Sequence, residues 1–123
     1  MVLVDTSVWV AHLRQGGIGL EALLHGGRVV CHPCIIGELA CGNLRNRSGI
    51  ISLLQRLPGA IRARHEEVMQ FIETYGLMGK GLGCIDMHLL AAAMLTGVPL
   101  WTLNKRLNAV ARQLGLAHST SDR

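Results

Sequence analysis

The sequence has few aromatic residues, few prolines and no long uninterrupted apolar segment. Two Trp, one Tyr and one Phe are its only aromatic residues, although half of the 123 residues are hydrophobic. The core must therefore be built from Leu, Val, Ile and Ala. The apolar stretch at 89–103 is broken by Gly97 and Pro99 and is shorter than the roughly 20 residues of a membrane span. The N-terminus has neither the basic region nor the cleavage site of a signal peptide. These absences predict a soluble, cytoplasmic protein.

Cysteines are also too few for a disulfide framework of the kind found in small secreted proteins. The four lie within apolar segments, at Cys31, Cys34, Cys41 and Cys84. The pair in "CHPC" admits another interpretation, because a C-x-x-C at a strand-to-helix junction is the reactive site of thiol–disulfide oxidoreductases. A zinc site that combines these cysteines with a histidine is a weaker alternative, since no second close pair is present.

The charge of the chain is modestly positive. Twelve basic residues, most of them Arg, stand against eight acidic ones and give a formal net charge of +4. Arginine suits two-pronged contact with phosphate, so this balance is compatible with a nucleic-acid partner. The positive charge allows nucleic-acid binding but does not by itself indicate it.

Short apolar strands alternate with helices along the chain. This alternation is typical of a parallel sheet covered by helices on both faces, in one domain spanning 1–123. The patterns predict strands at 2–4, 28–32, 60–64, 98–103 and 116–119. They predict helices at 6–13, between the glycine pairs 16–17 and 26–27, and at 33–44, 48–57, 65–76, 84–97 and 104–115.

Three of the acidic residues do not fit a simple solvent-exposed role. Asp5 directly follows the first strand, Glu38 shares a helix face with apolar or small residues, and Asp86 lies near the start of a helix. Each has an ordinary explanation: Asp5 as a helix cap, Glu38 at a helix rim or in a salt bridge, and Asp86 as a favourable first-turn charge. Together, the three acids favour a different explanation, a shared functional site, because functional sites of parallel sheets lie beyond the carboxyl ends of the strands.

Three carboxylates that converge at one sheet edge would repel one another unless a cation lay among them. Ligands made only of oxygen suit Mg²⁺ or Mn²⁺ rather than zinc. Such an ion can activate water and neutralise charge on a phosphodiester. The hydroxyls of Thr6 and Ser7 are close enough in sequence to orient a ligand or a bound water.

Four segments in series resemble one family. They are "VDTSVW", "IIGELACG", "GLGCIDMHLLAAA" and "LWTLNKRL", and they span nearly the whole chain. The sequence resembles the PIN-domain ribonucleases, specifically the VapC toxins of VapBC toxin–antitoxin systems. The resemblance implies a three-layer α/β/α domain with a central, mainly parallel, short-stranded sheet. It implies an endoribonuclease toxin that hydrolyses RNA phosphodiester bonds with Mg²⁺ or Mn²⁺.

By motif position, the resemblance places the family's first three acids at Asp5, Glu38 and Asp86. Asp5 and Asp86 would be the principal metal ligands, and Glu38 would complete the set and help to orient the attacking water. The fourth acid of the family falls on Asn104, a neutral residue that would stabilise a second cation less well. Asn104 is thus expected to support catalysis, although capping of its own helix explains it equally well.

The resemblance also implies an RNA substrate, a VapB-type antitoxin partner and a homodimer, with no membrane association. Lys80, Lys105 and Arg106 are the first candidates for substrate phosphate contacts, together with Thr6 and Ser7. Because Asn104 departs from the family pattern, a catalytically weak module that binds RNA or antitoxin is the main alternative. The oxidoreductase that would use Cys31 and Cys34 is the other.

Overall fold

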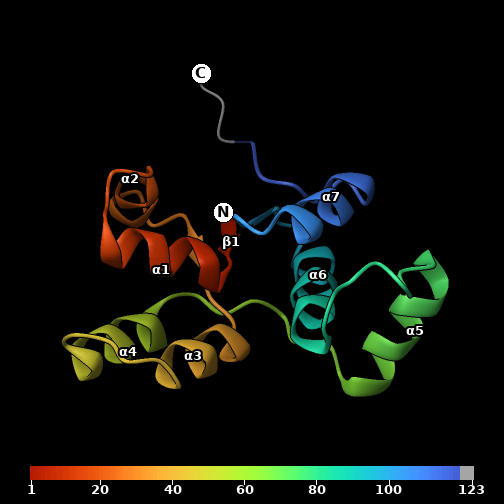
Figure 1. Cartoon of the computed structure of the whole chain (residues 1–123), viewed down its shortest axis with the longest axis horizontal. Coiled ribbons are helices and arrows are strands. Elements are labelled where there is room, and N and C mark those ends of the chain that lie inside the picture. The colour runs from red at the N-terminus through yellow and green to blue at the C-terminus, as the bar shows by residue number, and fades with distance from the viewer. Residues whose placement is uncertain (120–123) are drawn as a thin grey trace.

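The computed structural model describes residues 1–119 and forms three layers. The sheet contains β1 (Val2–Val4), β2 (Val29–Val30) and β3 (Leu100–Trp101), all parallel, in the order β2-β1-β3. Helices α1 to α4 lie on one side of β1 and α5 to α7 on the other (Figure 1). The predicted three-layer α/β/α class is therefore confirmed.

The helices follow the predicted order. On one side are α1 (Thr6–Arg14), α2 (Leu20–His25), α3 (Pro33–Ala40) and α4 (Arg47–Arg56); on the other are α5 (His65–Tyr75), α6 (Cys84–Thr96) and α7 (Lys105–Gln113). Pro33 occupies the first turn of α3, where a missing N–H costs nothing. The helix predicted for 33–44 is shorter and ends at Ala40, before the turn that leads to Asn46, a residue with a positive φ of 50°.

Two predicted strands are wrong. Residues 60–64 do not form a strand: this part of the chain makes only one bridge, between Cys31 and Gly59. Residues 116–119 likewise contribute a single bridge, between Ala117 and Leu100. Both segments lie at the sheet margins, beside β2 and β3, where few partners are available for a ladder.

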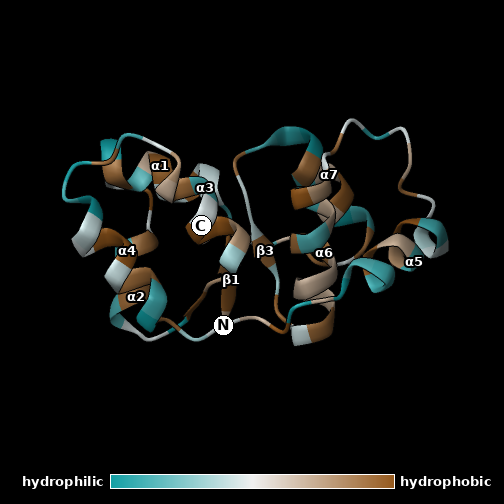
Figure 2. Cartoon of the chain, turned by 90° about the horizontal axis from the view of Figure 1, so that it is seen from below, coloured by the Kyte–Doolittle hydropathy of each residue, from teal (hydrophilic) through white to brown (hydrophobic). Residues whose placement is uncertain are grey.

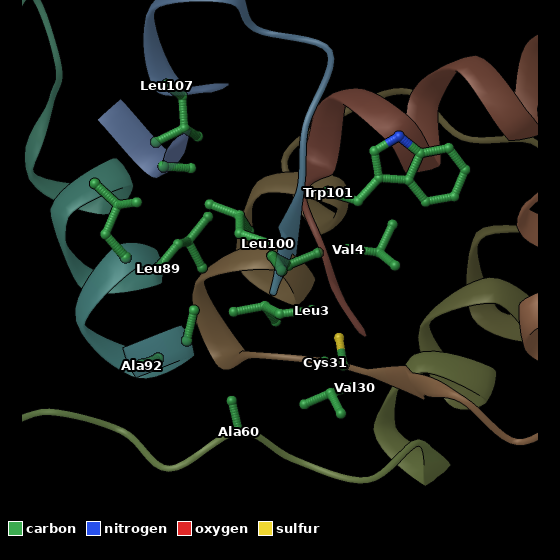
Figure 3. Close-up of a cluster of buried hydrophobic side chains, with 14 of the residues drawn as sticks. Leu3, Val4, Val30, Cys31, Ala60, Leu89, Ala92, Leu100, Trp101 and Leu107 are labelled. Carbon is green, nitrogen blue, oxygen red and sulfur yellow. The ribbon is translucent and has the colours of Figure 1, made fainter. Parts of the chain in front are cut away.

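The core is aliphatic, as the composition predicted. The apolar side chains of all three strands are buried, and α6 buries Leu89, Leu90 and the alanines after them. Figure 3 shows Leu89 and Leu107 from the α6–α7 side meeting Leu3 and Leu100 of the sheet. Viewed from below, β1 and β3 appear mostly brown between the two helical layers (Figure 2). Each buried Leu contributes about 2 kcal/mol, so the core holds the strand ends in place.

Candidate active site at the carboxyl edge of the sheet

Asp5 lies at the carboxyl end of β1, in the centre of the sheet edge. Its side chain is 7% exposed, and Oδ2 accepts hydrogen bonds from Ser7 Oγ and Thr102 Oγ1, both at 2.7 Å. The capping bond from Ser7 N is longer, at 3.4 Å. Capping is thus present but secondary, and the short hydroxyl bonds fix the orientation of the carboxylate.

Thr102 is a site residue that the sequence reasoning missed. It follows β3 just as Asp5 follows β1, and the register places the two residues side by side, one step beyond the Val4–Trp101 pair. Thr102 Oγ1 donates to Asp5 and accepts from the backbone N of Asn104 at 3.0 Å. A buried hydroxyl directly after a short apolar strand was the available signal.

Ser7 and Thr6 bond to different acids. Ser7 Oγ donates to Asp5 and accepts from Leu103 N at 3.0 Å, which ties α1 to the loop after β3. Thr6 Oγ1 donates to Glu38 Oε1 at 2.6 Å, so α1 also holds the carboxylate of α3. These adjacent hydroxyls therefore link the acids of two separate elements.

Glu38 lies on α3 one turn after Cys34 and Ile35, but its side chain is exposed to solvent, as the helix-rim alternative anticipated. It borders a groove of about 560 Å³ that Thr6 also lines. The walls of this groove are apolar at Val10 and Leu39 and carry arginines at Arg14 and Arg45. An exposed carboxylate beside a groove is accessible to a ligand.

Asp86 lies in the first turn of α6, where its Oδ2 accepts from Gly83 N at 3.2 Å. This is the favourable first-turn placement that the ordinary explanation anticipated. Asn104 caps α7: its Oδ1 accepts from Arg106 N at 3.0 Å and Leu107 N at 3.1 Å. The predicted cap is thus confirmed, and the amide oxygen is committed to the helix.

Three of the candidate phosphate contacts, Lys80, Lys105 and Arg106, come from the same surface. Gly81, with a positive φ of 77°, has Arg106 packed against it, since a Cβ there would lie 2.8 Å from Arg106 Nη1. Lys80 precedes this glycine, and Lys105 opens α7; all three basic side chains are exposed. The glycine-rich connector and the start of α7 thus form one basic surface.

Within the described part of the chain, Asp5, Glu38 and Asp86 form no ion pair with a cationic side chain. The ion pairs within residues 1–119 join His12 to Glu21 and Arg64 to Glu67, and neither involves Asp5, Glu38 or Asp86. For buried Asp5 this is unusual, because a buried charge is costly unless it is paired. The described hydrogen bonds to Asp5 reach only Oδ2, so Oδ1 remains available for a positive ligand.

A metal ion fits this donor set chemically, although the acids do not form a closed cage. Within residues 1–119, no three side chains of His, Cys, Asp or Glu are grouped closely enough to hold a metal unaided. Mg²⁺ usually keeps several waters and is bound through one or two carboxylates. An open oxygen site centred on Asp5 is therefore compatible with such an ion.

The cysteines are unsuited to redox catalysis. Burial raises the pKa of the Cys31 thiol to about 11. The pKa of Cys34 is also raised, first by burial and then by the nearby Glu38 carboxylate and Cys84. A reactive C-x-x-C requires the opposite, a lowered thiol pKa. The structure thus disfavours the oxidoreductase alternative.

Comparison with known proteins agrees with this geometry. The sequence model described as the PIN domain matches residues 2–113, so the chain belongs to the PIN domain family. The chain is 41% identical, over 118 residues, to Ribonuclease VapC32 of Mycobacterium tuberculosis, in strains CDC 1551 / Oshkosh and ATCC 25618 / H37Rv. The match covers 95% of this chain and 95% of each relative. The resemblance to VapC ribonucleases inferred from four motifs is confirmed.

One further observation concerns membranes. Among residues 1–119, none of the helices combines the length and the apolar composition that a bilayer crossing requires.

Proposed function

We propose that the chain is a toxin endoribonuclease that hydrolyses RNA phosphodiester bonds at the carboxyl edge of its sheet. The observation that carries this proposal is the buried carboxylate of Asp5, which is fixed by two hydroxyl donors and forms no ion pair with a cation among residues 1–119. The similarity to ribonuclease VapC32 supports RNA as the substrate.

Asp5 and Asp86 would hold Mg²⁺ or Mn²⁺, with Glu38 completing the oxygen set. When bound, the ion supplies Lewis-acid stabilisation of the phosphodiester and lowers the pKa of water. Ser7 and Thr102 both bond Asp5 Oδ2, and no described hydrogen bond from residues 1–119 reaches Oδ1, so Oδ1 would be the atom that binds the cation.

Glu38 has a separate task in this proposal. Thr6 anchors one of its oxygens and leaves the other exposed beside the groove. The exposed oxygen would accept a hydrogen bond from the attacking water and thereby orient it. Lys80, Lys105 and Arg106 would contact substrate phosphates from the neighbouring basic surface.

Asn104 would act as a positioning residue. Its backbone N–H bonds Thr102 Oγ1, which in turn donates to Asp5. Since Asn104 Oδ1 caps α7, we infer that catalysis uses a single cation rather than two.

A VapB-type antitoxin and a second copy of the chain complete the proposal. The family resemblance supports both, and exposed apolar side chains such as Ile61, Met69 and Met78 around α5 are compatible with a protein contact. Sedimentation of the purified chain, with and without its antitoxin, would determine both stoichiometries.

Cleavage of a pool of cellular RNAs by antitoxin-free protein tests the function. The reactions contain Mg²⁺, Mn²⁺ or EDTA, and Asp5→Ala and Glu38→Gln are compared with Glu73→Gln, an exposed acid on α5. We expect discrete products that disappear with EDTA and in the first two variants only. Equal cleavage by all variants would refute the carboxylate site. Absence of cleavage with either metal would favour the binding-module alternative.

A further inference from the structure

A second hollow, of about 410 Å³, lies beside the acidic elements. It is lined by His32 and Cys34 at the start of α3, by Arg62 and Arg64 in the segment that joins α4 to α5, and by His88 on α6. Nothing in the catalytic assignment uses these side chains, and their basic character is opposite to that of the acids.

Arg62 and Arg64 differ in whether another side chain compensates their charge. Arg64 Nε lies 3.5 Å from Glu67 Oε1, so part of its charge is compensated. Arg62 makes no hydrogen bond or ion pair with any of residues 1–119, and it is exposed. The Arg62 guanidinium is therefore available to an anion.

His32 provides a buried donor in the same hollow. The residue is 3% exposed, and its Nδ1 accepts a hydrogen bond from Cys34 N at 3.0 Å. The proton of the neutral ring must then lie on Nε2, which is buried and has no hydrogen-bond partner among residues 1–119. An unsatisfied buried donor costs about 1–3 kcal/mol, and an anionic oxygen would satisfy it.

The backbone of α3 does not supply the donors. Pro33 has no N–H, Cys34 N bonds His32 Nδ1, and the next two amides bond the carbonyl oxygen of His32. Binding in this hollow therefore depends on the side chains of His32 and Arg62, with Arg64 in support.

The hollow adjoins the acids through two elements. Cys34 precedes Glu38 by one helical turn, and that carboxylate is close enough to raise the pKa of Cys34. His88 follows Asp86 by two residues on α6. The hollow is therefore lined by residues of α3 and α6, the two helices that carry Glu38 and Asp86.

We propose that the hollow formed by His32, Arg62, Arg64 and His88 binds a backbone phosphate of the RNA next to the scissile one. This inference rests on the proposed function. A polyanionic strand matches the site, because the exposed Arg62 fork can contact two phosphate oxygens. His32 also lines the hollow, and its Nε2 has no hydrogen-bond partner among residues 1–119.

The test measures binding without cleavage. A short, fluorescently labelled single-stranded RNA is titrated with protein in EDTA at several salt concentrations. The proteins are the unchanged chain, Arg62→Ala, Arg62→Lys and the control Arg28→Ala. Arg28 is an exposed arginine directly before β2, at the opposite edge of the sheet.

We expect Arg62→Ala to weaken binding by about tenfold at low salt, since charge-assisted hydrogen bonds are lost. The slope of log K against log salt should fall by about 0.7, the value for one phosphate contact on a single strand. Arg62→Lys should keep the slope but lose part of the affinity, and Arg28→Ala should behave like the unchanged chain.

Three results would overturn the proposal: RNA binding by Arg62→Ala that equals binding by Arg28→Ala, no RNA binding by the unchanged chain, or a loss confined to antitoxin binding. The last would identify the hollow as a protein-docking site. Because EDTA removes cleavage from the assay, a failure of the nuclease proposal is seen separately. If cleavage is metal-dependent but Arg62→Ala binds RNA as well as the unchanged chain, the phosphate-site proposal is refuted and the nuclease proposal stands.

Discussion

Acidification should destabilise the fold through the buried imidazole of His32. Burial lowers the pKa of His32 from 6.5 to about 4, with repulsion from His88 and Arg62 as further causes. Above pH 6.5 the ring is neutral in both the folded and the unfolded chain, so it has no effect on stability. Between pH 6.5 and 4 the unfolded chain binds a proton that the folded chain does not, so the free energy of unfolding falls as the pH falls.

The size of this effect follows from the two pKa values. The interval from 6.5 to about 4, at about 1.4 kcal/mol per pH unit, sets an upper limit of about 3.5 kcal/mol for the loss. This is a large part of the roughly 5–15 kcal/mol that stabilises a typical domain. Most of the loss should already be present at pH 4.5.

Urea unfolding followed by Trp fluorescence would measure the loss, because Trp9 and Trp101 are both buried. His32→Asn is the matched variant: Asn is a favourable N-cap, so it can accept the bond from Cys34 N but cannot titrate. Carboxylates affect both proteins equally, so the difference between them isolates His32. His32→Ser is a second capping variant should Asn fold poorly.

We expect the variant to lose about 2–3 kcal/mol less than the unchanged chain between pH 7 and pH 4.5. If both proteins lose the same free energy, the imidazole is not held neutral by burial. The reasoning about its proton on Nε2, and with it the buried donor in the basic hollow, would then be wrong.

The remaining predictions concern the acid edge. Asp5→Asn should reduce RNA cleavage by at least about 100-fold. The same substitution should leave the melting temperature in metal-free buffer unchanged or higher, since it removes a buried unpaired charge. A lower melting temperature in calorimetry would contradict this. Thr102→Val should cost about 1–3 kcal/mol and lower cleavage about 10–100-fold, because Asp5 and the backbone N of Asn104 both lose their partner. Thr102→Ser should restore both, and a Val variant with full activity would exclude this positioning role. Asn104→Asp retains a helix cap and should lower the Mg²⁺ concentration needed for half-maximal cleavage by about tenfold. An unchanged metal titration would show that the side chain at position 104 does not face the cation.

Much of the fold and the list of acids could be predicted from local patterns. Apolar strands bounded by glycines, Pro33 at a helix start and Asn104 at a cap act over a few residues, so sequence spacing reveals them. The strands predicted at 60–64 and 116–119 failed because a strand exists only if a neighbour is in register with it. That condition depends on the whole sheet rather than on the segment.

The candidate site, like the fold, was determined partly by the sequence and partly by the tertiary structure. The sequence by itself determined that Asp5, Glu38 and Asp86 are acids at the beginning or in the first turns of helices that follow strands or loops, and that the chain carries the PIN motifs. Only the tertiary structure decided that Glu38 is exposed and bonded to Thr6, and that Thr102 holds Asp5 across 97 residues of chain. It also placed Arg62 beside His32. The physical reason is that burial and hydrogen-bond partnership depend on which segments meet at the sheet edge, and parallel strand order brings together residues that are remote in sequence.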